Sequence, residues 1–333
     1  MKIVFVGTSE FAVSILKSIK SETDWEIGLV VCEPAKPAGR SNKITDSPVA
    51  LEAKKLGARV YAPESISDPK APEIISKIGA DVFVVAAYGQ IIPQSVFDIP
   101  KYKTVNIHPS LLPKLRGPSP IQAALLNGLK ETGVSLMLID RKMDRGAVLS
   151  QKTFAISDSD NYQTLESKLS ALGSEMLIRD LPKYIGGGIK PAPQDESEAT
   201  YTRLIKREYG RADWNKSARE IYNQWRAFSK WPGLFTFFKN RNGQNVRLKL
   251  IDISCHSLTQ CHSRGSGNLD LDSHFHGNDM EPGTIAVDEQ KNLLIVCGDG
   301  AIQIKKLQPE NSKTQTAAEF LNGYGYVIGQ KLR

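Results

Sequence analysis

Three polar residues in the middle of the chain have the types and spacing for acyl-transfer chemistry. Asn106 and His108 lie two apart in the stretch VNIHPSLLP (105–113), and Asp144 follows in the turn RKMDRG. Residues two apart on a strand project to the same side, so a carboxamide and an imidazole would face one pocket. An amide can donate to an oxyanion, an imidazole titrates near neutrality, and a carboxylate can orient the ring. We therefore take these three as the candidate catalytic residues.

The same region lacks a nucleophile for a covalent enzyme intermediate. No Ser or Cys sits in a nucleophile elbow, the sharp strand-to-helix turn that exposes such a group. The remaining chemistry is direct attack by a substrate nucleophile on a bound acyl donor. On spacing alone, a histidine near an asparagine is also typical of a structural pair. His108 stands apart, however, because the other four histidines all fall within residues 255–280.

Alternating strands and helices are expected to position this group. Strands are expected at 2–7, 26–32, 80–89 and 104–108, and helices at 10–20 and 119–128. Such alternation predicts a parallel sheet with helices on both faces. Ligand sites in these sheets lie outside the carboxyl ends of the strands. Asn106 and His108 end the fourth strand and therefore stand at the expected place.

The later part of the chain differs in composition and in the elements it predicts. Two more strands and a long helix are expected at 133–140, 147–156 and 164–185, before a Gly-, Pro- and acid-rich stretch. A basic helix and five short strands with glycine turns follow, and they fit a small barrel. The predicted fold class is α/β: a Rossmann-like domain with a mostly parallel sheet (1–187), a linker (188–207) and a C-terminal OB-like β-barrel (208–333).

Positive charge is concentrated in the second half of the chain. The net charge is +7, yet residues 1–200 hold 24 Lys and Arg against 23 Asp and Glu. Residues 201–250 hold 12 against 3. A basic segment joined to a neutral domain indicates an anionic polymer as partner. A solvated basic face with no partner is the alternative.

Several classes of protein and ligand are not expected. The sequence contains no run of eighteen apolar residues, so we expect no membrane span. Gly7 to Glu10 interrupt the apolar N-terminus, which we therefore interpret as a strand rather than a signal peptide. Four cysteines without a pairing framework fit a reducing cytoplasm. The sequence contains neither a GxGxxG pattern after the first strand nor a GxxxxGK[ST] pattern, so we expect no bound dinucleotide or nucleoside triphosphate. The Cys and His residues of 255–280 match no zinc spacing, so we expect a disordered insertion and no metal.

A long stretch around the candidate site resembles a known family. NIHPSLLPKLRGPSPIQAALLNGLKETGVSLMLIDRKMDRGAVLSQ is similar to the signature of the folate-dependent formyltransferases, and MKIVFVGTSEFAVSIL and AAYGQIIP resemble further family segments. The resemblance implies 10-formyltetrahydrofolate as formyl donor, with Asn106 and His108 donating to the developing oxyanion. It also implies that Asp144 holds the imidazolium or relays a proton. The family's folate-binding loop corresponds to Ser110, Leu111, Leu112 and Pro113.

Two other regions resemble family members that act on methionyl initiator tRNA. They are CEPAKPAGRSNKITDSPV (32–49) and the C-terminal half, including DWNKSAREIYNQWRAFSKWPG. The resemblance implies initiator methionyl-tRNA as acceptor and partner, in a cytoplasmic enzyme that we expect to be a monomer. The basic residues expected to contact the tRNA are Lys36, Arg40, Lys43, Lys206 and Arg207.

Three alternative functions share parts of this pattern. A formyltransferase acting on a small amine, such as glycinamide ribonucleotide or an amino sugar, would use the same three residues. It would not need a basic second domain or the 32–49 loop. An RNA-binding protein with an idle first domain has no reason to keep the three polar groups together. A hydrolase of formyl-folate would need no acceptor amine.

Overall fold

The computed structural model describes residues 1–38, 43–256 and 280–332. The expected insertion at 255–280 therefore lies almost wholly outside the described residues, as does Arg40. The chain divides into two compact units. Unit 1 comprises Met1–Ala124, Lys130–Asp158 and Thr164–Leu204, and unit 2 comprises Leu125–Leu129, Ser159–Gln163 and Ile205–Arg333.

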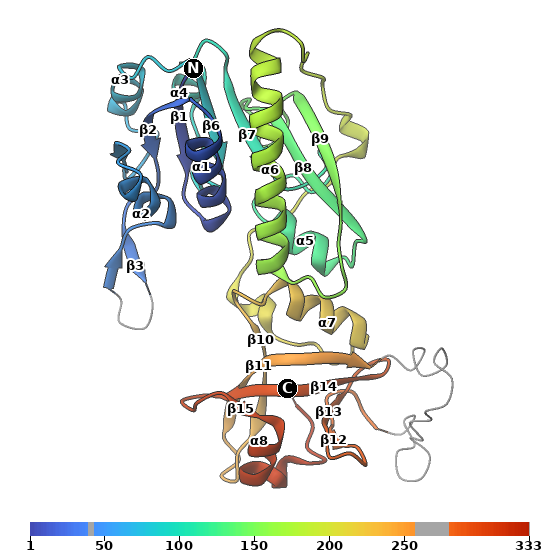
Figure 1. The fold of residues 1–333 in the computed structure, drawn as a ribbon. Helices are drawn as coiled ribbons and strands as arrows, with labels where there is room; N and C mark the ends of the chain where they lie inside the picture. The colour runs from blue at the N-terminus through green and yellow to red at the C-terminus, as the bar shows by residue number, and fades with distance from the viewer. Residues whose placement is uncertain (39–42, 257–279, 333) are drawn as a thin grey trace. The chain divides into compact units, whose positions relative to one another are not determined.

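Unit 1 is built on a seven-stranded sheet flanked by helices (Figure 1). The strands are β1 Lys2–Gly7, β2 Glu26–Val31, β5 Val60–Tyr61, β6 Val82–Ala86, β7 Thr104–His108, β8 Glu131–Leu138 and β9 Val148–Ala155. The helices are α1 Glu10–Glu22, α2 Pro48–Lys55, α3 Lys70–Ser76, α4 Gln94–Phe97, α5 Pro120–Leu126 and α6 Tyr162–Ile185. A short hairpin, β3 Lys36–Ala38 and β4 Lys43–Thr45, stands apart from the sheet.

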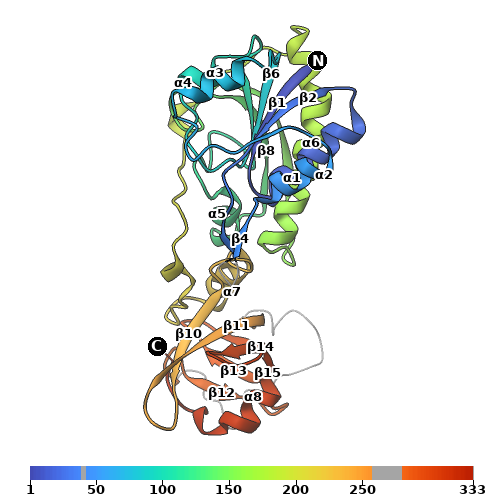
Figure 2. The same ribbon diagram turned by 90° about the vertical axis from the view of Figure 1, so that its left-hand side faces the viewer.

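The central strands are apolar on both sides because helices cover both faces of the sheet. Val4 and Val6 of β1 belong to a buried cluster with Ile75 of α3 and Val96 of α4. The alternate residues of β1, such as Phe5, face the other side and are equally buried. Figure 2 shows α3 and α4 on one side of the sheet and α1, α2 and α6 on the other. Continuous apolar runs are what such doubly covered strands require.

The strand order β5-β2-β1-β6-β7-β8-β9 places the candidate site where the sheet changes direction. The strands from β5 to β7 pair in parallel, whereas β8 pairs antiparallel with both β7 and β9. His108 at the end of β7 lies opposite Ser135 of β8. The connection from β8 to β9 carries Asp144, and it returns to the carboxyl end of β7.

Unit 2 is built on an antiparallel sheet of order β10-β11-β14-β13-β12, with β15 added beside β14. Its elements are α7 Ala218–Ala227, β10 Leu234–Lys239, β11 Asn245–His256, β12 Ile285–Val287, β13 Leu293–Val296, β14 Ala301–Pro309, β15 Gln315–Thr316 and α8 Ala317–Tyr324. Short 3-10 turns, η2 Arg207–Gly210 and η4 Gly325–Val327, complete it. Ser217 and Thr316 each form a capping box with the glutamate three residues on, which fixes where α7 and α8 begin.

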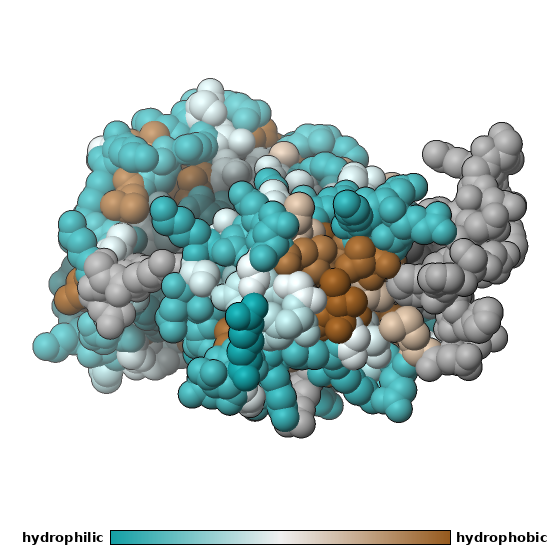
Figure 3. Space-filling model, turned by 90° about the horizontal axis from the view of Figure 1, so that it is seen from below, coloured by the Kyte–Doolittle hydropathy of each residue, from teal (hydrophilic) through white to brown (hydrophobic). Residues whose placement is uncertain are grey.

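The core of unit 2 gathers apolar side chains from the sheet and its two helices, among them Ile221, Phe238, Leu250, Ile302 and Phe320. The face in Figure 3 is largely hydrophilic, with one larger group of hydrophobic side chains right of centre and smaller ones elsewhere. Among the described residues, no helix is long and apolar enough to cross a membrane. The predicted fold class, a mostly parallel α/β domain followed by a small β domain, is confirmed. The exact domain boundaries stay a prediction.

Candidate active site

His108 is buried at the carboxyl end of β7, and its two ring nitrogens have different neighbours. The Nε2 atom lies 3.1 Å from the carbonyl oxygen of Leu115. A carbonyl oxygen can only accept a hydrogen bond, so Nε2 carries the proton. The Nδ1 atom faces Asp144 Oδ1 at 3.8 Å, which is too long for a hydrogen bond. The carboxylate would attract this nitrogen only when Nδ1 also carries a proton.

Asp144 reaches His108 from the β8–β9 connection through an unusual backbone conformation. Its φ of +53° lies in the left-handed region, which Asp tolerates better than most residues. The carboxylate is fixed from a second direction, because the backbone N–H of Gly117 donates to Oδ2 at 2.7 Å. Gly117 itself has φ +107°, and a Cβ there would lie 2.9 Å from the backbone oxygen of Thr202. This position therefore requires glycine.

Asn106 lies two residues before His108 on the same strand and is half-buried. Its backbone pairs with Val85 of β6 and Met137 of β8, so its position is set from both sides. Within the described part of the chain, its carboxamide has no hydrogen-bond partner. A donor held rigidly in place and not otherwise engaged is suited to bind an oxygen of a ligand.

The loop after His108 is held by a compact set of hydrogen bonds. Ser135 Oγ accepts from the backbone N–H of Leu112 at 3.0 Å and donates to the Ser110 carbonyl oxygen at 2.6 Å. Gln151 Nε2 donates to the Leu112 carbonyl oxygen at 2.7 Å. Ser110 is fully buried and its hydroxyl donates to the Lys114 carbonyl oxygen. Leu112 is buried as well, so Leu111 and Pro113 offer the accessible side chains of the predicted folate-binding loop.

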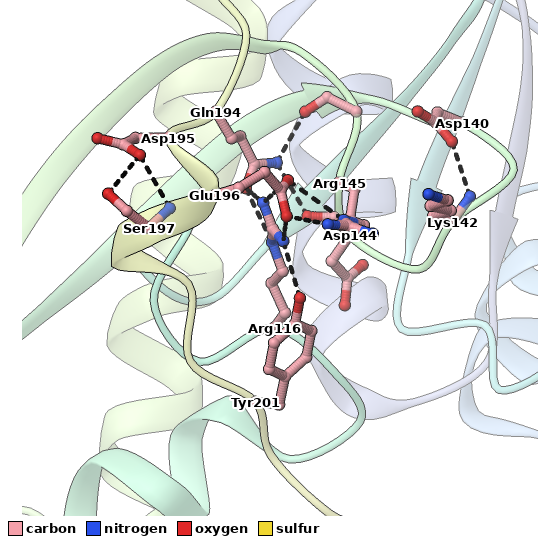
Figure 4. A network of polar contacts seen from close by, with 11 residues as sticks. Arg116, Asp140, Lys142, Asp144, Arg145, Gln194, Asp195, Glu196, Ser197 and Tyr201 are labelled. Carbon is pink, nitrogen blue, oxygen red and sulfur yellow. Dashed lines mark hydrogen bonds and ion pairs between the residues drawn. The ribbon is translucent and has the colours of Figure 1, made fainter.

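Arg116 and the segment 194–201 form a polar network beside Asp144 that sequence reasoning missed (Figure 4). The Arg116 side chain is fully buried and forms hydrogen bonds with Gln194, Glu196 and Tyr201. Glu196 also pairs with Arg145. These two guanidinium groups lower the pKa of the Glu196 carboxyl to about 2. The Arg-Gly pair at 116–117 was visible in the sequence, but nothing in the sequence pointed to its partners.

Two pockets open on unit 1 near these elements. One, of about 450 Å³, is lined by Glu33, Lys36, Gln90 and Ile91 and adjoins the AAYGQIIP segment. The other, of about 730 Å³, is lined by residues of the β8–β9 connection together with Glu196. Within residues 1–38, 43–256 and 280–332, no cluster of three or more His, Cys, Asp or Glu side chains could hold a metal.

The basic residues predicted to bind tRNA are exposed wherever they are described. Lys36 and Lys43 lie on the β3–β4 hairpin of unit 1, where Lys36 Nζ pairs with Glu33 at 2.8 Å. Lys206 and Arg207 lie in unit 2 and are exposed. The structure therefore brings together Asn106, His108 and Asp144 within unit 1, and it divides the basic residues between the two units.

A further basic group lies in unit 2, on one side of the β10–β11 pair. Arg247 stands 3.9 Å from the centre of the Phe235 ring, and Arg211 stands over Phe237. The pKa of Arg247 is lowered by burial and by the nearby charge of Arg207. Its Nε is buried and has no hydrogen-bond partner. Positive charge interleaved with aromatic rings is typical of a surface that binds a nucleic acid.

Comparison with known families gives two matches that together span most of the chain. Residues 1–181 match the family model described as formyl transferase. Residues 204–325 match the model described as formyl transferase, C-terminal domain. The first match contains every predicted catalytic and folate-binding residue, and the second contains the basic part of unit 2.

Relatives of known name match over nearly the whole length. The chain is 39% identical to a methionyl-tRNA formyltransferase of Enterococcus faecalis, over 99% of this chain and 98% of that protein. It is 36% identical to a methionyl-tRNA formyltransferase of Streptococcus pneumoniae, over 98% of this chain and 97% of that protein.

Among solved structures, similarity extends to proteins of lower sequence identity. HypX from Aquifex aeolicus in complex with tetrahydrofolic acid has a TM-score of 0.61 at 18% identity, over 98% of this chain and 48% of that chain. An N-formyltransferase from Helicobacter canadensis, in complex with folinic acid and dTDP-3-aminofucose, has a TM-score of 0.60 at 20% identity, over 91% and 98%. At these identities the similarity establishes the fold alone.

Proposed function

We propose that this chain, which belongs to the formyl transferase family, transfers the formyl group of 10-formyltetrahydrofolate to the α-amino group of methionyl initiator tRNA. The family resemblance drawn from the sequence is confirmed. The observation that carries the proposal is the match of both units, at 36–39% identity, to named methionyl-tRNA formyltransferases. Structural neighbours that act on other acceptors share the fold, so the fold alone does not choose the acceptor.

The catalytic group fits attack of an amine on an activated formyl group, which the folate donor supplies. Negative charge develops on the formyl oxygen as the amine attacks, and the unengaged Asn106 carboxamide can donate to that oxygen. Asn106 and His108 face the same side of β7, so the oxygen and the attacking nitrogen would lie between them. This arrangement supports assigning Asn106 to oxyanion stabilisation.

The geometry supports proton transfer as the main role of His108. Its Nε2–H is already donated to Leu115, so the nitrogen that can take up a proton is Nδ1. That nitrogen faces Asp144 at 3.8 Å, and a nearby carboxylate stabilises the imidazolium that forms. Donation from His108 to the formyl oxygen would have to use Nδ1 in its protonated state. We assign Asp144 to orienting and charging the ring. The proton taken from the amine would then pass to the folate nitrogen as its bond to the formyl carbon breaks, which would release tetrahydrofolate.

The loop from Ser110 to Pro113 is proposed to bind the folate. The fully buried Ser110 hydroxyl is engaged within the loop, so its role would be to shape the loop rather than to contact the ligand. Leu111 and Pro113 would supply the apolar contacts. Ligand sites of this kind combine apolar side chains with a few fixed polar groups, and Leu111, Pro113 and Asn106 offer these two kinds of group. The two pockets described above are lined by other residues.

The basic residues are proposed to bind tRNA phosphates. Lys36 and Lys43 are exposed on a hairpin, and Arg40 belongs to the same proposed contact. Lys206 and Arg207 are exposed near the start of the basic part of unit 2. Arg207, Arg211 and Arg247 concentrate positive charge there, which supports an anionic polymer as partner.

The cellular setting stays a proposal as well. Cys32, Cys255 and Cys297 form no disulfide bond, which fits a reducing compartment. Use of initiator tRNA in translation supports a cytoplasmic location. We propose a monomer, which sedimentation at the assay concentration would test.

Competition between acceptors tests the proposed function. The purified full chain is incubated with labelled 10-formyltetrahydrofolate and methionyl initiator tRNA, free methionine, glycinamide ribonucleotide or an amino sugar nucleotide. We expect formylation of the charged tRNA only. Transfer to a small amine in preference to the tRNA would show that the acceptor is a small amine and contradict the proposal. Formate release without any acceptor would indicate a hydrolase.

A further inference from the structure

The tripeptide 115–117 connects the two ionisable residues of the candidate site. The carbonyl oxygen of Leu115 accepts from His108 Nε2, and the backbone N–H of Gly117 donates to the Asp144 carboxylate. Arg116 stands between these two contacts, with its side chain fully buried. Any displacement of Arg116 would therefore move the partners of both His108 and Asp144.

Gln194 joins Arg116 to the turn that carries Asp144. Its Oε1 accepts from Arg116 Nε and Nη2 at 3.0 and 2.7 Å. Its Nε2 donates to the carbonyl oxygens of Asp144 and Gly146 at 2.9 and 2.7 Å. A carboxamide has two donor hydrogens and two acceptor lone pairs, so its hydrogen-bonding capacity is fully used by these two loops.

The rest of the Arg116 side chain is also fully paired. Its two terminal nitrogens donate to the Glu196 carboxylate at 3.1 and 2.9 Å, and Nη1 donates to the Tyr201 hydroxyl oxygen at 3.1 Å. Together with Gln194, these partners account for all five N–H groups of the guanidinium. Leaving a buried charged donor unpaired is costly, so the side chain has one favourable position.

The backbone of the same segment runs beside the site loop. Arg116 N donates to the Thr200 carbonyl oxygen at 2.9 Å, and Thr202 N donates to the Arg116 carbonyl oxygen at 2.7 Å. The Thr200 hydroxyl oxygen accepts from the backbone N–H of Leu115 at 2.8 Å. Residues 194–202 are thus fastened to 115–117 by both side chain and backbone, and the amide of Gln194 extends this attachment to the Asp144 turn.

We propose that Gln194 is a positioning residue, which sets the separation of His108 and Asp144 by holding Arg116 and the Asp144 turn together. The catalytic part of this inference rests on the proposed function; the geometric part does not. Gln194 acts through Arg116 and through two backbone carbonyl groups. A misplacement of about 1 Å can lower a rate by roughly 100-fold, so its loss should affect turnover rather than substrate binding.

Two substitutions test the acceptor oxygen and the donor nitrogen of the Gln194 amide separately. Gln194→Met keeps the length and removes every hydrogen bond, whereas Gln194→Glu keeps an acceptor for Arg116 and loses both donors to the turn. We expect kcat to fall by roughly 10- to 100-fold in both, with unchanged KM for tRNA and folate. The exposed Gln163 supplies the control, and Gln163→Met should match wild type. A raised KM with unchanged kcat would assign Gln194 to substrate binding and overturn the proposal.

A second readout does not depend on activity. Hydrogen exchange of the Gly117 amide, which donates to Asp144, is measured on the full chain. We expect faster exchange in both Gln194 variants than in wild type and in Gln163→Met, and if Gln194→Met fails to fold, Gln194→Glu decides. Should the wild type transfer no formyl group, the proposed function fails, while the exchange rates still test the geometry. Unchanged exchange in a folded variant would overturn the proposal.

Discussion

The two ring nitrogens of His108 are distinguished by their surroundings, and this difference organises the proposed chemistry. Leu115 holds Nε2–H, which fixes the orientation of the ring. In the proposed mechanism, a proton taken from the attacking amine would arrive at Nδ1, on the side of Asp144. Asp144 cannot turn away easily, because the Gly117 amide holds its second oxygen. One loop thus orients the base and its carboxylate together.

Asn106 offers the most direct test at the scale of a single residue. Asn106→Asp keeps the shape of the side chain and removes its N–H donors. We expect kcat to fall by roughly 100- to 1,000-fold, the usual loss for one oxyanion donor, with little change in melting temperature. Asn242→Asp, in an exposed turn, is the matched control. An Asn106→Asp enzyme with normal kcat would remove Asn106 from the mechanism.

Glu196 gives a prediction for pH. Its hydrogen bonds with Arg145 and Arg116 lower the pKa of its carboxyl from 4.5 to about 2. A carboxyl with a lower pKa in the folded chain stabilises the fold above the unfolded value, and this contribution is lost as pH falls from 4.5 through about 2.

The melting temperatures of wild type and Glu196→Gln should therefore differ at neutral pH and converge as the pH falls through this range. The difference should be small, because the side chain is half exposed. Glu22→Gln, at the exposed end of α1, is the control. If the melting temperature of wild type exceeds that of Glu196→Gln by the same amount at the lowest pH as at neutral pH, the assigned pKa shift is contradicted.

At the scale of elements, the β8–β9 connection brings Asp144 to a strand that ended 36 residues earlier in the chain. β8 runs antiparallel to β7, so the chain must turn back before Asp144 can reach His108. Gly146 makes this turn possible, because a Cβ there would overlap the Leu138 carbonyl oxygen. That oxygen belongs to the backbone of β8 and has little freedom to move.

Gly146→Ala should therefore displace the turn and reduce activity. A shift of about 1 Å at Asp144 predicts a fall in kcat approaching 100-fold. Gly323→Ala is the control, because a Cβ at Gly323 in α8 meets no atom within 4 Å. That change should leave kcat unaltered and stabilise the helix by about 0.5–1 kcal/mol. Equal kcat in the two variants would show that the turn need not be held in place.

The elements were more predictable from the sequence than the contacts between them. The strand 104–108 was predicted with the bounds that β7 has, because its apolar run ends sharply at Pro109. The β3–β4 hairpin was expected only as a loop, because its strands have three residues each and the side chains of Lys43–Thr45 are all exposed. Arg116 and Gln194 were not selected, because their 78-residue separation carries no local pattern.

At the scale of the whole molecule, the balance of charge differs between the two units. Unit 1 contains the proposed catalytic residues, and its part of the sequence is nearly neutral. Residues 201–250, mostly in unit 2, carry 12 Lys and Arg against 3 Asp and Glu. Basic residues that neutralise phosphates release counterions, so binding of tRNA should weaken as salt concentration rises.

Removing one phosphate contact should change this salt dependence by a predictable amount. Lys43→Ala is expected to weaken tRNA binding and to lower the slope of log K against log salt by about 1. Lys20→Ala, which removes an exposed charge from α1, is the control and should leave the slope unchanged. Identical slopes in the two variants would remove the hairpin from the tRNA interface.

The central claim is that His108, placed at the end of β7 and backed by Asp144, carries protons during formyl transfer to methionyl-tRNA. Single-turnover formylation of methionyl initiator tRNA by wild type and His108→Gln tests it directly. A glutamine amide can still donate to the Leu115 carbonyl oxygen but cannot take up a proton. The account predicts rapid formylation by wild type and a rate roughly 100- to 10,000-fold lower in the variant. A His108→Gln enzyme that formylates the tRNA at the wild-type rate would contradict it.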